Sequence, residues 1–264
     1  MKATYVKRKT NYEEIMNKRI NNFFIVVQII AITIPMGKGI ILEKSKIYVI
    51  YGIDIYGRKT LIGLYEEDKE NSRYWLEEIE KIKRRGLEKI IYVSTERNKR
   101  LEQAIKIVYN PIVRISVNEE VERIAKYTQY RWKATGEQEL VRAYLSETEE
   151  EYAEVMKEIK KKYKDNKIGM ELLEKFEKEK AKEIKEAKEI RHLICSYATK
   201  RRLKQNIENI FKEYEEVEDL NDLVEKRKDY LSTFEKTRIY SKEKWTGILN
   251  KIYEMKYEEI KEYV

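Results

Sequence analysis

The chain begins with short apolar, mostly β-branched runs and later changes to apolar positions at helical spacing. The run FFIVVQIIAITI at residues 23–34 has the composition of a buried strand, and the next two runs are joined by Tyr56-Gly57, a typical hairpin turn. Helical periodicity over about residues 72–85 and 98–108 predicts two helices. The sequence therefore predicts the order β-β-β-α-β-α-β, with strands at residues 23–34, 46–55, 59–65, 89–94 and 111–117.

From residue 119 onward the apolar positions recur only at helical spacing. We expect residues 119–189 to form an all-α insertion, because their acids and bases are interleaved as on solvated helices with i,i+4 charge pairs. Residues 190–264 are expected to supply C-terminal helices that complete the core begun by residues 1–118. The predicted fold class is α/β, a mixed sheet with flanking helices and an all-α insertion.

Composition excludes several classes of protein. The 264 residues carry 56 Lys and Arg against 48 Asp and Glu, a net charge of +8, with only 9 Gly and 2 Pro, so collagen-like and low-complexity chains are excluded. One cysteine, Cys195, and one histidine, His192, exclude a disulfide framework and a Cys-based zinc finger. The longest apolar run is shorter than the roughly 20 residues that span a membrane. We therefore expect no membrane partner and a cytoplasmic location, with nucleoid association as the alternative.

Residues 50–109 carry a resemblance to a known family. This stretch is similar to the core of the Mutator-type (MULE-like) transposases, a branch of the DDE transposases, in a glycine-marked hairpin, a helix with an aromatic-Trp-Leu opening and a basic ending before glycine, and a helix with Ala-Ile. A weaker match lies at residues 190–208. The resemblance implies a ribonuclease-H-like fold. The matching residues are Gly52, Gly57, Arg58, Lys59, Gly63, Leu64, Tyr74, Trp75, Leu76, Arg84, Arg85, Gly86, Ala104 and Ile105.

The resemblance also implies three carboxylates that hold two divalent cations for phosphoryl transfer. The first acid aligns with Gln28 or Ile29, the second with Glu96 and the third with Arg201. A Cys-x-x-His element of the family would fall within residues 114–119, where neither residue type occurs. Because only Glu96 is acidic, we expect no metal site, no cofactor and no small-molecule substrate, and a protein that is not an enzyme.

Basic residues near two of these positions suggest a nucleic-acid-binding face. The predicted function is therefore a catalytically inactive, domesticated transposase-like protein that binds nucleic acid, most simply duplex DNA, where the metal site would have been. The alternative for this charge is a solubilising surface, in a composition similar to that of proteins from hot environments. The predicted contacts are Arg97, Lys99, Arg100, Lys200, Arg201, Arg202 and Lys204.

Two other functions remain open from the sequence. One is a protein-interaction or assembly module, with a protein partner or a homo-oligomer, in which the helical insertion supplies the contact surface. The other is an active DDE transposase or nuclease whose acids are misaligned, using Glu96 with Asp54 and an acid such as Glu208. Salt-dependent DNA binding separates the nucleic-acid hypothesis from the first alternative, and divalent-metal-dependent nicking separates it from the second.

Overall fold

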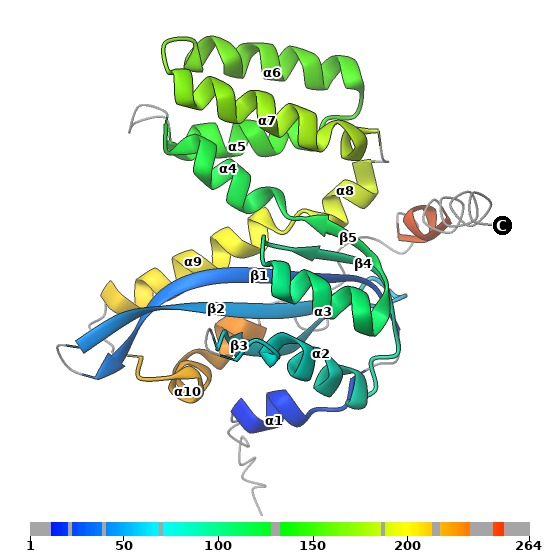
Figure 1. Cartoon of the computed structure of the whole chain (residues 1–264), viewed down its shortest axis with the longest axis vertical. Helices are drawn as coiled ribbons and strands as arrows, with labels where there is room; N and C mark the ends of the chain where they lie inside the picture. Colours follow the sequence, from blue (N-terminus) through cyan, green and yellow to red (C-terminus); the bar gives the residue numbers. More distant parts are fainter. Residues whose placement is uncertain are drawn as a thin grey trace, which may run out of the picture. The chain divides into compact units, whose positions relative to one another are not determined.

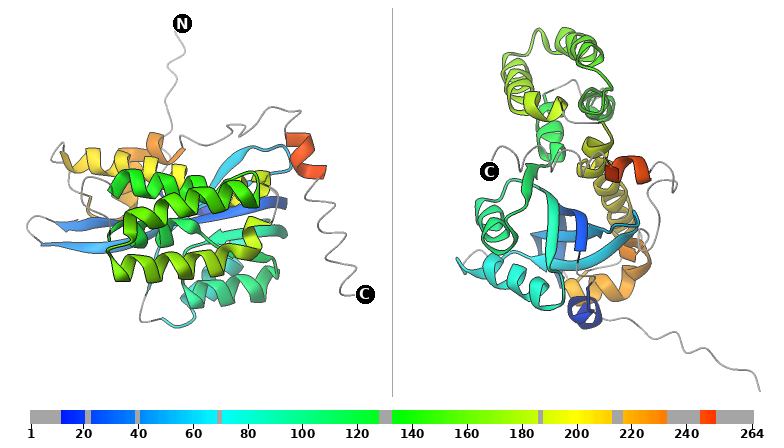
Figure 2. Two further views of the ribbon diagram at one scale, coloured as in Figure 1. Left: turned by 90° about the horizontal axis from the view of Figure 1, so that it is seen from above. Right: turned by 90° about the vertical axis from the view of Figure 1, so that its right-hand side faces the viewer.

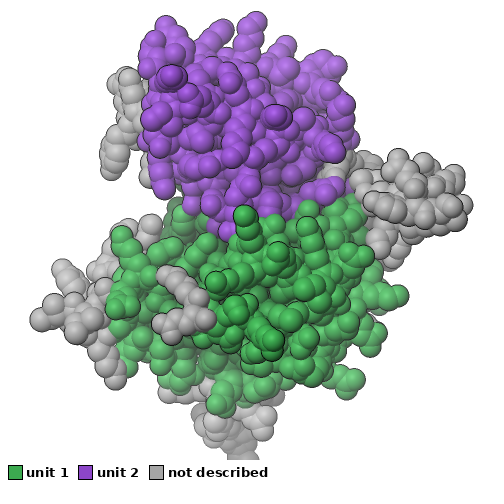
Figure 3. Space-filling model, in the orientation of Figure 1, with its two compact units in different colours: residues 1–93, 98–113, 199–239 green, residues 94–97, 114–198, 240–264 purple. Residues whose placement is uncertain are grey.

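The structure is a computed structural model that describes residues 12–20, 23–38, 41–68, 71–127, 133–185, 188–212, 217–232 and 245–250. The chain divides into two compact units, coloured separately in Figure 3. Unit 1 comprises residues 1–93, 98–113 and 199–239, and unit 2 comprises residues 94–97, 114–198 and 240–264. Each unit has an apolar core of its own.

The centre of the fold is a five-stranded mixed sheet in the order β3-β2-β1-β4-β5 (Figure 1). β1 is antiparallel to β2, and β2 is antiparallel to β3. The backbone N–H of Ser116, just after β5, donates to the carbonyl of Thr95 at the end of β4, so these two strands end side by side and run parallel. The predicted α/β class is confirmed. The strand bounds are Phe23–Lys38, Ile41–Ile53, Lys59–Glu66, Lys89–Thr95 and Ile112–Ile115 for β1 to β5.

The first two strands extend further than the sequence predicts. Pro35 and Gly37 predict a loop after residue 34, because proline and glycine favour turns, but β1 continues to Lys38, with Pro35 opposite Lys44. Proline is compatible with a strand where its missing N–H is not needed for the ladder. The N–H of Gly37 donates to the carbonyl of Val217 at 3.0 Å. Pro35 and Gly37 therefore lie within the two-stranded ribbon formed by β1 and β2.

Helices cover both faces of the sheet in unit 1, as the right-hand view of Figure 2 shows. On one face, α2 (Tyr74–Arg84) and α3 (Lys99–Tyr109) pack on the odd-numbered residues Val27 and Ile29 of β1. On the other face, the even-numbered Ile30 and Ile32 lie in a core shared with α1 (Tyr12–Asn17), α9 (Tyr197–Lys212) and α10 (Leu220–Ser232). Strand alternation thus decides which side chain meets which helix.

Unit 2 contains the helices from α4 to α8. Its core is formed by apolar side chains at helical spacing, such as Val117, Val121 and Ile124. β5 ends at Ile115, short of the predicted 117, because Ser116 Oγ accepts from the N–H of Asn118 and caps the following helix. None of the described helices is both long and apolar enough to cross a bilayer. The helices are α4 (Val117–Ala125), α5 (Lys133–Tyr144), α6 (Glu149–Tyr163), α7 (Lys167–Ile184) and α8 (Lys188–Ile194).

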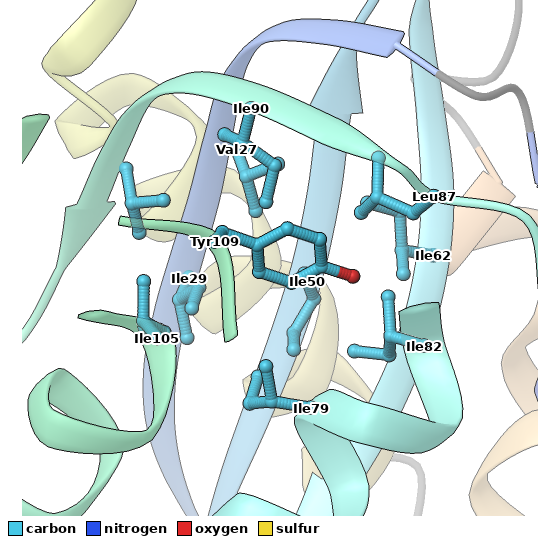
Figure 4. Close-up of a pocket in the computed structure, with 11 residues that line it drawn as sticks. Val27, Ile29, Ile50, Ile62, Ile79, Ile82, Leu87, Ile90, Ile105 and Tyr109 are labelled. Carbon is cyan, nitrogen blue, oxygen red and sulfur yellow. The ribbon is translucent and has the colours of Figure 1, made fainter. Parts of the chain in front are cut away.

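A small apolar cavity lies between the sheet and the α2–α3 layer (Figure 4). It is lined by isoleucine, leucine and valine side chains and by Tyr109, and its volume is about 10 Å³. That is about the least space that holds one water molecule, and the lining offers almost no polar partner. The hydroxyl of Tyr109 is buried and has no hydrogen-bond partner among the described residues. The cavity is therefore a packing defect and not a ligand site.

Tyr109→Phe is expected to raise the free energy of unfolding by about 1 kcal/mol, because the change removes a buried hydroxyl that has lost water without gaining a partner. Urea denaturation of both proteins measures the difference. Tyr12→Phe is the matched control, since the hydroxyl of Tyr12 donates to the carbonyl of Leu64 at 3.1 Å and its loss should destabilise the chain. Equal losses in both variants would contradict the prediction.

Candidate functional site

The position aligned with the first acid of the family lies in a buried polar cluster of unit 1. Gln28, in β1, accepts a hydrogen bond through Oε1 from Nζ of Lys59 at 2.7 Å. The same ammonium group donates to Oγ1 of Thr199 on α9 at 2.9 Å and lies 4.7 Å from the centroid of the Tyr51 ring. Three strands and one helix therefore meet at Lys59, and we call Gln28, Tyr51, Lys59 and Thr199 the Lys59 cluster.

Strand alternation explains which residues take part. Gln28 shares a face of β1 with Ile30, the face that α9 covers, whereas Ile29 points to the opposite core with α2 and α3. Gln28 lies opposite Tyr51 in the ladder of β1 and β2, and Lys59 lies opposite Ile53 in the next ladder. Of the two positions aligned with the first acid, only Gln28 therefore faces α9.

The environment of Lys59 opposes its positive charge. Lys59 is 4% exposed, and this burial lowers the pKa of its amine to about 7. The Gln28 and Thr199 oxygens and the Tyr51 ring all favour the ammonium form, but they replace only part of the hydration that burial removes. The amine therefore changes its protonation near neutral pH.

The alternative acids Asp54 and Glu96 belong to different units of the chain. Asp54, in unit 1, accepts hydrogen bonds from the backbone N–H groups of Tyr56 and Arg58 and forms an ion pair with the Arg58 guanidinium at 2.8 Å, so it builds the β2–β3 turn. Glu96 directly follows β4 and is buried within unit 2. The side chain of Glu208 lies outside the described residues.

The Lys59 cluster does not fit a divalent metal ion. Magnesium in such sites is held by several anionic oxygens. Around Gln28 the structure has instead an ammonium group and a hydroxyl, and the ammonium already donates to the one amide oxygen that faces α9. Among the described residues there is no group of three or more His, Cys, Asp and Glu side chains that could hold a metal. No reaction step is therefore assigned to a metal at this cluster.

Arg97 links the helices α4 and α7 within unit 2. Its guanidinium donates to the carboxylates of Glu120 on α4 and Glu179 on α7 at 2.6 and 2.5 Å. Glu120 also lies 3.4 Å from the buried ammonium of Lys180. Because two carboxylates already balance its charge, Arg97 is poorly suited to hold a phosphate as predicted.

The other predicted cations belong to unit 1. Lys99 and Arg100 are exposed in the first turn of α3, which Asn98 caps by accepting from the N–H of Leu101 at 3.1 Å. On α9, Lys200 is buried, whereas Arg201 and Arg202 are exposed and Lys204 is half-buried. The outward side of α9 therefore carries the predicted arginines, while its inward side carries Lys200 and Leu203.

The place of the Cys-x-x-His element holds a buried polar group in unit 2. The amide nitrogen of Asn118 donates to Oγ of Ser196 at 2.7 Å, and the hydroxyls of Ser116 and Ser196 are 3.4 Å apart. All three side chains are buried. These neutral groups join the start of α4 to the residue before α9.

Sequence reasoning missed the central role of Lys59 and of Thr199. Lys59 was noted only as part of the hairpin motif, although a lysine that shares a strand face with the apolar Leu61 is the signal that could have revealed it. Thr199 was hidden among the basic residues that follow it. Arg191, nine residues before Lys200, is also buried and donates to the backbone carbonyls of Tyr144 and Ser146, so it is a structural residue.

Comparison with known proteins decides the family. A family model described as "Transposase, Mutator family" matches residues 7–214 of this chain. The chain belongs to the Mutator family of transposases. It is also similar to a probable transposase for an insertion sequence element from Corynebacterium diphtheriae, with 22% identity over 142 residues, 52% of this chain and 41% of the relative. The chain thus spans about two fifths of the length of that relative.

Membership of the Mutator family confirms the resemblance and corrects one prediction. The prediction that the protein is not an enzyme is wrong, because the matching family and the Corynebacterium diphtheriae relative are transposases, and a transposase is an enzyme. Gln28, Ile29 and Arg201 stand where the resemblance implies acids. Those identities exclude carboxylates at three aligned positions, but they do not show that the chain lacks its catalytic residues.

Lys59 should make stability depend on pH. Because its pKa is lower in the folded chain, about 7, than the ordinary value of 10.5, the unfolded chain binds more protons between these two values. The free energy of unfolding should therefore rise as the pH increases from about 7 to about 10, by on the order of 3 kcal/mol from this group. Denaturant unfolding at several pH values measures the rise.

Lys59→Met should remove this part of the pH dependence, because the variant has no amine to titrate. The exposed Lys106→Met on α3 is the control and should leave the profile of the wild type unchanged. If the profiles of the wild type and of Lys59→Met run parallel between pH 7 and pH 10, the assigned titration is wrong.

Proposed function

We propose that this Mutator-family protein acts on DNA and holds the duplex through the outward side of α9. The observation that carries the proposal is the orientation of α9, which buries Lys200 and Leu203 and leaves Arg201 and Arg202 in solvent. Guanidinium groups bind phosphates with paired hydrogen bonds, and such contacts position a protein on DNA without reading its sequence. The proposed contacts are Lys99, Arg100, Arg201, Arg202 and Lys204.

Three observations support this choice over a merely solubilising surface. All five cations lie in unit 1, and Lys99, Arg100, Arg201 and Arg202 are exposed, so they can contact DNA without a change in the fold. Arg201 makes no hydrogen bond or ion pair with the described residues, so a phosphate would not have to displace an internal partner. A transposase must also bind DNA to act, and the family membership supplies that requirement.

We also propose that unit 1 has the ribonuclease-H-like fold. The sheet order β3-β2-β1-β4-β5, with two antiparallel pairings followed by a parallel pair, supports this proposal. A helical segment inserted before α9 agrees with the organisation that the family resemblance implies. Gln28 then lies on the face of the first strand that α9 covers, while Arg201, aligned with the third acid, lies on the outward side of α9.

The replacement of both exposed arginines by glutamine, Arg201→Gln/Arg202→Gln, should weaken duplex binding by at least about tenfold. The slope of log K against log salt should fall by about 0.9 for each phosphate contact that is lost. Fluorescence anisotropy with a labelled duplex at several salt concentrations measures both quantities. Lys200 is left unchanged, because it is buried and its replacement would disturb the fold.

The matched control changes the same amount of charge elsewhere. Lys157→Gln/Lys161→Gln replaces two exposed lysines of α6 in unit 2 and should leave the affinity within about twofold of the wild type. Equal weakening in both double variants would show that net charge and not α9 holds the DNA. Unchanged binding in the arginine variant would remove α9 from the interface.

A further inference from the structure

The turn between β2 and β3 exposes an aromatic side chain in unit 1. Tyr56 lies at the tip of this turn and is 57% exposed, and the neighbouring Ile55 is 37% exposed. Most tyrosines that flank the turn, such as Tyr48, Tyr51 and Tyr65, are buried in the core. The exposure of Tyr56 is therefore not a general property of the aromatic residues of this sheet.

The turn that carries Tyr56 is held rigidly by Asp54. One carboxylate oxygen accepts from the backbone N–H groups of Tyr56 at 2.8 Å and of Arg58 at 3.0 Å. The other accepts from Nε of Arg58 at 2.9 Å and forms the ion pair with its terminal nitrogen. Gly57 supplies the positive φ of 70° that the tight turn needs. The aromatic tip therefore loses little backbone entropy when it binds a partner.

The ring of Tyr56 is also oriented in advance. The guanidinium carbon of Arg58 lies 4.8 Å from the ring centroid, so the arginine covers the ring while Asp54 fixes the arginine. A ring supported in this way and still more than half exposed is a suitable platform for a second flat group.

The hydrogen bond between Lys59 and Thr199 connects β3, the strand that follows this tip, to α9. Lys59 is three residues after Tyr56, and Thr199 is two residues before Arg201. The tip and the exposed arginines of α9 thus both belong to unit 1. A partner that has both flat rings and closely spaced negative charges is a nucleic acid, and only a base outside the duplex stack offers a free face to Tyr56.

We infer that Tyr56 is a stacking platform for an unpaired base of DNA whose phosphates lie along α9. This inference rests on the proposed function and adds to it a preference for DNA with a single-stranded overhang or gap next to the duplex. Aromatic stacking of one base typically changes affinity by about five- to a hundredfold when the ring is removed.

The test compares a blunt duplex with the same duplex carrying a short single-stranded overhang that contains 2-aminopurine. Tyr56→Ala should weaken binding to the overhang DNA by about tenfold or more, leave blunt-duplex binding within about twofold, and abolish the change in 2-aminopurine fluorescence. Tyr56→Phe should keep both properties, because it keeps the ring. Ile107→Ala, at an isoleucine of α3 that is 71% exposed, is the control for loss of exposed apolar surface.

The outcomes separate this inference from the proposed function. If the wild type binds both DNAs and Tyr56→Ala binds them equally well, the stacking role is wrong and the α9 interface is unaffected. If Tyr56→Ala weakens both DNAs equally, Tyr56 is a duplex contact and the stacking role is again wrong. If the wild type binds neither DNA, both proposals fail. Thermal unfolding of the variants verifies that each is folded.

Discussion

The buried ammonium group of Lys59 is the constraint on which unit 1 depends. Removing a charge from water is costly, and the fold offsets part of that cost with the Gln28 amide oxygen, the Thr199 hydroxyl and the Tyr51 ring. These partners come from β1, β2 and α9. Because the Lys59 ammonium contacts all three, its interactions fix two further strands and a helix relative to β3. An apolar side chain would pack there without specifying which oxygen of α9 faces the sheet.

The orientation of α9 follows from the hydrogen bond between Lys59 and Thr199. Once Thr199 faces Lys59, helical periodicity places Leu203, four residues later, in the core next to the sheet. Arg201 and Arg202 then fall on the outward side, where the structure has them exposed. The cations proposed to hold DNA are therefore positioned by a residue that does not itself contact DNA. The same hydrogen bond joins α9 to β3, the strand that follows the turn carrying Tyr56, and both parts of the proposed surface belong to unit 1.

Local patterns in the sequence were sufficient for most of the fold. The Tyr56-Gly57 turn and the apolar periodicity each act over a few residues, so the chain order of strands and helices could be predicted. The end of β1 could not, because Pro35 was interpreted by its general preference and not by its place in a two-stranded ribbon. The Lys59 cluster could not either. Its hydrogen bonds join residues 31 and 140 positions apart, and no short-range pattern encodes such pairs.

The predicted basic surface shows why counting charges does not locate a binding face. Seven cations were selected from the sequence, but the structure gives Arg97 two carboxylate partners and buries Lys200. A cation that is already balanced must give up its ion pairs before it binds a phosphate, and a buried one must first reach solvent. Arg201 is exposed and has no ion pair with the part of the chain that the structure describes, so it bears neither cost there. The five remaining cations all belong to unit 1, so the proposed interface needs only the sheet and its own helices to be in place. Net charge attracts DNA from a distance, but ion pairs within the protein decide which cations can bind its phosphates.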